Sequence, residues 1–589
     1  MPKKHKRQEP KPGQPNKTAR PCAGQLAQTG SHTLTTLSVG SLPILNWILE
    51  RMKLEEFLQK HLKPDGSRTR IPTSRVLLIL VRNLLISREP IYGIGEWASQ
   101  YAPDLLGLSP EDLRWFSDDQ AGRGLDKLFQ TGEAELVMDA VREVIQEFGL
   151  SLDEFHNDGT SVSVFGAYAQ ADEEGVKQGR KTVAVTYGHS KAHRPDLKQL
   201  LYTLTITEDG GVPVYFTTHS GNTVDDKTHC ETWDILRQLV GRADFLYVAD
   251  CKLASTDNMK YIHRQGGRFV TVLPATRKED RQFRQRLADN DPSAWDLVYH
   301  VSDDQDERQD TFRVYAEEIL TKEKYRLWWF HSTRKARRDA SARLSRIDRA
   351  IQDLSELRQK LLGERPRLRR VEQVQPVVDE ILQKYHVQDL LPVTLGQCDR
   401  PQYKQAGPGR PNKQTKFVKH SCYSCHLEWK IATYALSEAQ QGDGVFPLIT
   451  NTSDLTAEEV LRAYKRQPII EKRFSQLKTD FAVAPIYLKS VSRIQALFCV
   501  YFFSLMVQTL LERELREAMQ REGIASLPLY PEGRPCTKPT TRRILDVFEP
   551  VQRHRLQTGD TTQILTTELT DLQKSILKLL GMSSEDYGR

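Results

Sequence analysis

The chain has 589 residues and a net charge of +7, with 39% hydrophobic and 27% charged residues. This length predicts several domains, and this composition excludes a globally disordered chain. No apolar run follows the basic start, so a secretory signal is not expected. The eight cysteines are scattered, which is typical of a reducing compartment rather than of a disulfide framework.

The first 32 residues are predicted to form a basic, disordered tail. Residues 1–22 contain seven Lys or Arg, one Glu and five Pro. Such a segment cannot bury a core, and its charge suits contact with phosphates. It could equally serve only to keep the protein soluble, and the sequence favours neither alternative.

Residues 33–148 are predicted to form a helical N-terminal domain. Residues 74–86 are too apolar for a surface helix, so we expect them in the core of a small bundle. A second apolar stretch, residues 494–511, contains Gln495, Ser504 and Gln508 and runs into charged residues. A membrane span needs about 20 cleaner residues. We therefore expect a buried core helix there and no membrane.

Residues 149–275 change to a strand-rich pattern. The predicted strands and helices follow the order β-β-β-α-β-α-β, at residues 158–165, 200–207, 212–218, 226–240, 245–250, 255–265 and 268–273. Three consecutive strands can form a meander, and later crossovers then add parallel strands. This is the order of an α/β, ribonuclease H-like mixed sheet, in which the fourth strand lies beside the first.

Residues 276–440 interrupt this pattern and are predicted to form an insertion domain. Two β-rich pieces, 310–331 and 427–436, flank a charged helical section with 13 Lys or Arg and five Asp or Glu in residues 334–370. That section could follow a DNA backbone or form a solvated helical hairpin, and its positive excess favours DNA slightly. The catalytic core is predicted to resume at residues 441–520. Residues 521–589 form a C-terminal region without an assigned role.

Three distant carboxylates lie where a two-metal nuclease needs them. Asp158 lies in the first predicted strand, Asp250 ends the fourth, and Glu471 lies in a predicted helix over residues 464–478. Carboxylates in such positions can hold a pair of hard divalent cations about 3.5–4 Å apart. Two such ions can activate a water or a 3′-hydroxyl and stabilise the leaving oxygen of a phosphodiester.

The helix that contains Glu471 also carries a recognisable spacing. Tyr464, Gln467, Glu471 and Lys478 fit the signature Tyr-x2-Arg-x3-Glu-x6-Lys, with Gln in place of Arg. Over residues 33–550 the chain resembles the DDE transposases of bacterial insertion sequences, in the insertion-sequence-four superfamily. Residues 84–92, 118–123 and 187–199 are further stretches similar to one group of that superfamily, in which a Gln at the second signature position is usual.

The resemblance implies a DNA transposase with two Mg²⁺ or Mn²⁺ ions bound by Asp158, Asp250 and Glu471. It implies cleavage at the element's ends, joining of the 3′-hydroxyl to target DNA, a DNA hairpin on the excised end and cut-and-paste movement. Tyr464 and Lys478 would hold phosphates. Gln467 would face the DNA with one neutral hydrogen bond, and Arg466 would be its substitute. The N-terminal domain would recognise terminal inverted repeats, and the protein would act as a homodimer on DNA at the bacterial nucleoid, in the cytoplasm.

Two other functions and two minor motifs stay open at this point. A DNA-binding relative that lost catalysis is disfavoured by the intact carboxylates. A ribonuclease H-like nuclease without strand transfer would not need the N-terminal domain or the insertion. Cys422, Cys425 and His426 are too cramped for a good zinc site, so free thiols are favoured. Core packing is favoured over base stacking for Trp328 and Trp329.

Overall fold

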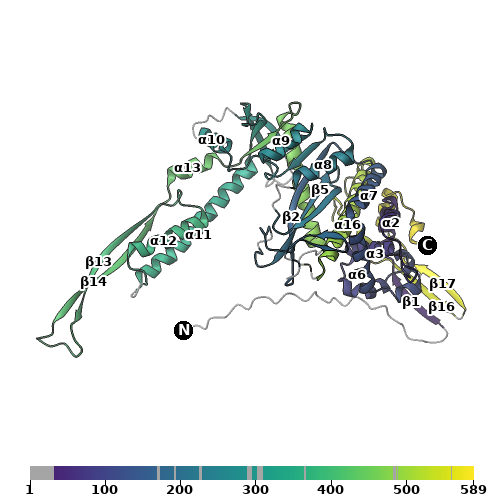
Figure 1. Cartoon of the computed structure of the whole chain (residues 1–589), viewed down its shortest axis with the longest axis horizontal. Coiled ribbons are helices and arrows are strands. Elements are labelled where there is room, and N and C mark those ends of the chain that lie inside the picture. Colours follow the sequence, from purple (N-terminus) through teal and green to yellow (C-terminus); the bar gives the residue numbers. More distant parts are fainter. Residues whose placement is uncertain are drawn as a thin grey trace. The chain divides into compact units, whose positions relative to one another are not determined.

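The computed structural model describes most of the chain after the predicted tail, which lies outside the described residues apart from His32. The described residues are 32–168, 171, 173–191, 194–223, 228–287, 295–301, 309–363, 367–481, 486, 488–558 and 560–588. The chain divides into two compact units (Figure 1). The first unit contains residues 1–249, 264–267 and 465–589, and the second contains residues 250–263 and 268–464.

The first unit contains the helices expected for its N-terminal region, which follow a strand that was not predicted there. Its helices are α1 (Leu42–Arg51), α2 (Leu54–His61), α3 (Thr73–Ile86), α4 (Ile94–Ser99), α5 (Pro110–Leu113), α6 (Asp118–Thr131) and α7 (Glu133–Phe148). Helix α3 is buried along nearly its whole length. A helix that is apolar on all sides must be surrounded by protein, and α3 is the core of this bundle.

A small sheet joins the two ends of the first unit, and the sequence did not predict it. Strand β1 (His32–Ser38) pairs antiparallel with β16 (Gln552–Thr558), which pairs with β17 (Thr561–Thr566). The C-terminal region also contains helices α17 (Thr541–Phe548) and α18 (Asp571–Leu579). Its role is therefore partly structural, because it completes a sheet whose first strand precedes the helical domain.

The main sheet of the first unit has the predicted ribonuclease H-like order. Strands β6 (Pro213–Ser220), β5 (Lys198–Thr207), β2 (Glu154–Val164) and β7 (Leu246–Ala249) follow one another in this order. The first three form an antiparallel meander, and β7 joins β2 in parallel after the crossover helix α8 (His229–Val240). The expectation that the fourth strand lies beside the first is confirmed.

Helix α16 (Val491–Arg521) packs on this sheet. Phe498 stacks on Tyr202 of β5 at 5.2 Å between ring centroids, and Phe502 lies 4.9 Å from Phe216 of β6. Among the described helices, α16 alone is long and apolar enough to span a membrane, but 94% of its most apolar window is buried inside the protein. The predicted buried core helix is confirmed.

The described strands of the second unit pair with one another in antiparallel fashion. Its strands follow the order β8 (Arg268–Val272), β15 (Val445–Thr450), β12 (Arg326–Ser332), β10 (Asp310–Tyr315) and β9 (Trp295–Val301), with β11 (Ile319–Leu320) on β12. Trp329 of β12 is buried and stacks on Phe283 of α10 (Lys278–Leu287) at 3.8 Å. Core packing, rather than base stacking, is therefore the role that the structure gives Trp329.

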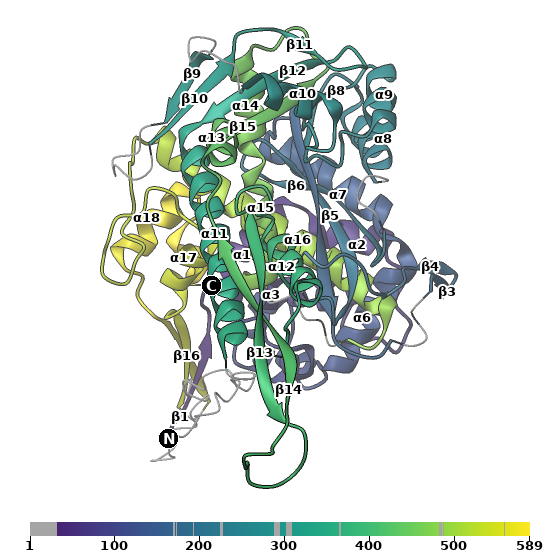
Figure 2. The same ribbon diagram turned by 90° about the vertical axis from the view of Figure 1, so that its left-hand side faces the viewer.

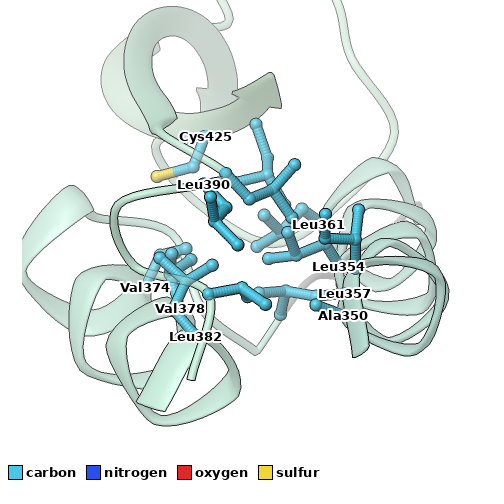
Figure 3. Close-up of a cluster of buried hydrophobic side chains, with 13 residues drawn as sticks. Ala350, Leu354, Leu357, Leu361, Val374, Val378, Leu382, Leu390 and Cys425 are labelled. Atoms are coloured by element: carbon cyan, nitrogen blue, oxygen red, sulfur yellow. The ribbon is translucent and has the colours of Figure 1, made fainter. Parts of the chain in front are cut away.

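An arm of two helices and a long hairpin leads away from these strands (Figure 1). It consists of α11 (Thr333–Leu362), α12 (Val371–Tyr385), β13 (Val393–Gln405), β14 (Phe417–Trp429) and α13 (Thr433–Gln441). The predicted apolar stripe of α11 packs against α12 and the base of the hairpin, where it forms the arm's core (Figure 3). The β-rich piece expected at 427–436 is wrong in its bounds, because β14 ends at Trp429 and α13 follows.

Candidate active site

The first two predicted carboxylates follow from the pairing of β2 with β7. Ala249, the last residue of β7, is the register partner of Asn157 in β2. Asp158 is the next residue of β2, and Asp250 directly follows the end of β7. Neighbouring strands lie about 4.8 Å apart. The described register therefore ends at the residues directly before Asp158 and Asp250, which 91 residues separate in the sequence.

Lys191 lies beside the carboxylate of Asp158, and Lys478 interacts with it electrostatically. Lys191 Nζ lies 3.5 Å from Asp158 Oδ1. The pKa of Lys478 is lowered by burial and then by repulsion from Lys191, while attraction to Asp158 opposes the shift. Asp158 therefore interacts with two ammonium groups. Their two positive charges exceed the single negative charge of the carboxylate, and this excess suits a phosphate at the same place.

Lys191 was not among the predicted site residues, although residues 187–199 carried part of the resemblance. The loop before it is fixed by Gln199, whose Nε2 donates to the carbonyls of His189 at 3.2 Å and Gly221 at 2.9 Å. A Cβ on Gly188 would lie 1.9 Å from the Gly221 carbonyl oxygen, so only glycine fits there. The backbone N–H of Lys191 donates to Ser161 Oγ at 2.9 Å, which anchors the loop on β2.

Glu471 lies on the short helix α15 (Pro468–Ser475), where its side chain is exposed. The predicted single helix over residues 464–478 is wrong. Helix α14 (Ala457–Arg466) ends before Gln467, Pro468 begins α15, and Lys478 lies in a π-helical turn, Gln476–Asp480. Proline has no N–H to continue the α14 ladder, so the chain breaks there. Turns of π-helix are frequent at functional sites.

Gln467 lies between the two helices with helical backbone angles, φ −50° and ψ −37°. Its side chain is 7% exposed, and Gln467 Nε2 donates to the Asn157 carbonyl at 3.1 Å. Gln467 Oε1 lies 2.8 Å from His156 Nδ1. The premise that Gln467 shares an exposed helix face with Glu471 is therefore wrong: both polar groups of Gln467 are used on β2, directly before Asp158.

The hydrogen bonds continue from His156 to Arg466. His156 Nε2 lies 2.8 Å from Glu154 Oε1, and Arg466 Nε donates to the same oxygen at 2.7 Å while its Nη2 donates to Glu154 Oε2. The two ring nitrogens of His156 therefore link Gln467 on one side to Glu154 on the other. Burial raises the pKa of Glu154, but the bonds from His156 and Arg466 outweigh it and hold that pKa below its usual value. Arg466 is thus committed to an ion pair rather than open to a phosphate.

We call the four residues Glu154, His156, Arg466 and Gln467 the β2 clamp. Within the first unit they tie the beginning of α15 to the strand that contains Asp158. Three of them are buried, and Arg466 is half-buried. The sequence offered little sign of this clamp, because its members lie on a strand and a helix more than 300 residues apart.

The other end of α15 is fixed by a buried ion pair. Arg473 Nη1 lies 3.2 Å from Glu512 Oε2 on α16, with side-chain exposures of 2% and 1%. Arg473 also donates to Gln476 Oε1 at 2.8 Å and to the Gly211 carbonyl, in the turn between β5 and β6, at 3.1 Å. Burial lowers the pKa of Arg473, and Glu512 opposes that shift. Glu471 therefore lies on a helix that is held at both ends.

The remaining predicted residues are placed as follows. Tyr464 lies at the end of α14 with its ring 6.2 Å from that of Phe446 in β15. Cys425 is a free, buried thiol in the arm's core, and His426 beside it in β14 is exposed. Within the described ranges, no group of three or more His, Cys, Asp or Glu side chains is gathered closely enough to hold a metal ion.

Two family models match parts of the chain. Residues 154–507 match the model of a family described as "Transposase DDE domain", and residues 34–141 match one described as "Domain of unknown function (DUF4277)". No curated protein matches the chain.

Two solved structures are similar in part. The cryo-EM structure of the piggyBac transposase synaptic complex with hairpin DNA is 11% identical, with 50% of this chain and 59% of that chain covered and a TM-score of 0.23. The crystal structure of the Mos1 mariner paired end complex with Mn is 9% identical, with 39% and 66% covered and a TM-score of 0.14. The chain thus spans less than two thirds of either protein.

Proposed function

The chain belongs to the transposase DDE domain family, and from this premise we propose that it cleaves the ends of a DNA element and joins them to target DNA. The observation that supports the proposal is the parallel pairing of β2 with β7, whose register ends at Asn157 and Ala249, the residues directly before Asp158 and Asp250. Adjacent strand ends are where carboxylates from distant parts of a chain can share a ligand. Glu471 is the proposed third member, on a helix tied to the same strand.

The oxygen donors of Asp158, Asp250 and Glu471 fit hard divalent cations such as Mg²⁺ or Mn²⁺. Two such ions supply a polarised attacking oxygen and stabilise the leaving oxygen of a phosphodiester. Lys191 and Lys478 then hold the DNA phosphate, because their charges lie beside Asp158. The same lysines compensate the carboxylate charge when cations are not bound.

The β2 clamp and the Arg473–Glu512 pair position Glu471 in this proposal. A shift of about 1 Å in a reacting group can cost about 100-fold in rate. A helix fixed to β2 at its beginning and to α16 at its end limits such shifts. Glu154, His156, Gln467 and Arg473 are therefore positioning residues rather than catalytic ones.

The remaining features of the proposal concern DNA recognition and assembly. The helical domain, residues 33–148, is proposed to recognise terminal inverted repeats, and the protein to act as a homodimer on double-stranded DNA. We also propose cut-and-paste movement. These features rest on the resemblance to insertion-sequence transposases rather than on a contact in this structure.

The test combines the purified chain with DNA ends of its own element and Mg²⁺. Asp158→Ala, Asp250→Ala and Glu471→Ala should each abolish strand cleavage while end binding persists, because binding rests on many phosphate contacts and the chemistry on the ions. Glu458→Ala, an exposed carboxylate on α14 paired with Arg462, is the matched control and should cleave normally.

Two results would change the proposal. Full cleavage by one of the three variants removes that residue from the trio. Cleavage by the wild-type protein without joining of pre-cut 3′ ends to a target plasmid would make the chain a nuclease and not a transposase. Removing metal with EDTA should stop both reactions, and Mg²⁺ or Mn²⁺ should restore them.

A further inference from the structure

The hairpin of β13 and β14 has two different halves. Its base packs into the arm's core through Leu395, Cys425 and Leu427, together with α11 and α12 (Figure 3). Its far half continues past the ends of these helices in both views of the arm (Figures 1 and 2). This far half, residues 403–419, is the hairpin tip.

The hairpin tip is strongly basic and solvent-exposed. Its 17 residues include five Lys or Arg and no Asp or Glu. The five are Lys404, Arg410, Lys413, Lys416 and Lys419, and all are exposed. None of them forms an ion pair with another residue of the described ranges, whereas on α11 Arg343 pairs with Asp443 at 2.6 Å. Cations this close together repel one another, so their placement favours an anionic partner.

The tip is also a shaped structure rather than a loose loop. Ala406 N–H donates to the Lys416 carbonyl at 2.8 Å, and the backbone N–H of Gln414 donates to Asn412 Oδ1 at 2.9 Å. Two aromatic side chains remain exposed on it, Tyr403 at 65% and Phe417 at 53%. They are diagonal neighbours on one face of the ribbon, because Tyr403 pairs with Lys419 and Gln405 with Phe417.

We propose that the hairpin tip is a docking surface for double-stranded DNA. A two-stranded ribbon fits the major groove, which is about 12 Å wide, and lysines along its edges reach phosphates on both sides. Exposed aromatics add interactions with bases and sugars that do not depend on salt. A second copy of the chain is a poor partner, because it would bring five like charges against five. The proposal rests on the proposed function only for the presence of DNA.

The test compares three forms of the full chain by fluorescence anisotropy on a random-sequence 40-base-pair duplex at several salt concentrations. Replacing all five basic residues of the tip with Ala should weaken binding at least tenfold near 150 mM salt. It should also flatten the plot of log K against log salt by about 0.9 for each phosphate that the variant no longer neutralises. The matched control exchanges Lys for Arg, and Arg410 for Lys, which keeps every charge and should keep both the affinity and the slope.

A second variant, Tyr403→Ser with Phe417→Ser, should weaken binding while it leaves the salt slope unchanged. The proposal is overturned if the Ala variant binds duplex as wild type does. It is also overturned if the weaker binding appears only on single-stranded DNA, or if sedimentation shows that the variant loses self-association instead. Far-UV circular dichroism confirms folding, since none of these side chains is buried.

This test separates the two proposals. The Ala variant keeps Asp158, Asp250 and Glu471 and should still cleave element ends at low salt, where weak binding is sufficient. Asp158→Ala should show the opposite behaviour, with wild-type affinity and no cleavage. If the wild-type protein cleaves nothing but the tip variant loses affinity, the DNA surface stands and the transposase function falls.

Discussion

At residue 467 the chain carries an amide where the signature has an arginine, and the surroundings explain why an amide fits. One side of Gln467 accepts from the His156 ring, and the other donates to the Asn157 carbonyl. An arginine has no acceptor to offer the ring and would place a cation against it. The substitution therefore belongs with His156 and Glu154 as one buried network.

Gln467→Leu tests whether this network positions Glu471. The variant leaves a ring N–H and a backbone carbonyl unsatisfied, which costs about 1–3 kcal/mol of stability. We expect cleavage to fall at least tenfold while affinity for end DNA stays unchanged, since Gln467 is buried away from solvent. Ser475→Ala, an exposed change on the same helix, is the control. Cleavage at the wild-type rate by a folded Gln467→Leu protein would show that the clamp does not position Glu471.

Residues 464–478 are helical as predicted, in separate pieces, but helical geometry alone did not place their side chains as the structure does. A continuous helix puts positions 464, 467 and 471 on one face. Pro468 breaks the ladder, and Gln467 is buried while Glu471 is exposed. Pro468 within the predicted helix was the sign of an interruption in the sequence. Which side chains are then buried could not be derived from the sequence, because this depends on the strand that packs against the helix.

Among the elements, α15 depends on the buried Arg473–Glu512 pair. Breaking a buried pair costs about 3–5 kcal/mol, and here Arg516, whose Nη2 lies 3.3 Å from Glu512 Oε2, keeps part of the carboxylate charge compensated. Arg473→Met should therefore lower the unfolding midpoint strongly in thermal denaturation. The double variant Arg473→Met with Glu512→Met removes both charges and should be more stable than Arg473→Met alone. Equal or additive losses would contradict the ion-pair account.

The sequence predicted some elements closely and missed others for a physical reason. Strands β5, β6, β7 and β8 begin and end within two residues of their predicted bounds, because buried strands have long apolar runs. The polar strands β1, β13, β16 and β17 were missed. Their stability comes from partners elsewhere in the chain, and local composition does not show that pairing.

At the scale of the whole molecule, the stability of the protein can depend on pH through an ion pair in one of its two compact units. In the second unit, Glu323 accepts from Arg277 Nη2 at 2.8 Å and from Thr256 Oγ1 at 2.9 Å. Burial raises the pKa of Glu323, but these bonds lower it to about 2. A folded-state pKa below the unfolded value stabilises the protein above pH about 4.5, and this contribution is lost as pH falls toward 2.

Glu323→Gln should therefore be less stable than wild type at neutral pH, by about 3 kcal/mol, if the pKa shift is converted directly. The difference should shrink steadily between pH 4.5 and about 2. Thermal denaturation across this range measures it, and Glu438→Gln, an exposed carboxylate on α13, is the control. A difference that does not change with pH would show that the ion pair is not the source of the stability.

The pairing of β1 with β16 also has a consequence for synthesis. Ser38 pairs with Gln552 and His32 with Thr558. A ribosome adds about 5–20 residues per second, so β1 waits roughly 25–100 s for its partner. During that time the nascent chain carries an unpaired strand edge, which can join another chain. A product whose translation stops before β16 keeps this edge open, so termination within the last strands would yield an aggregation-prone protein even when every proposed catalytic residue has been made.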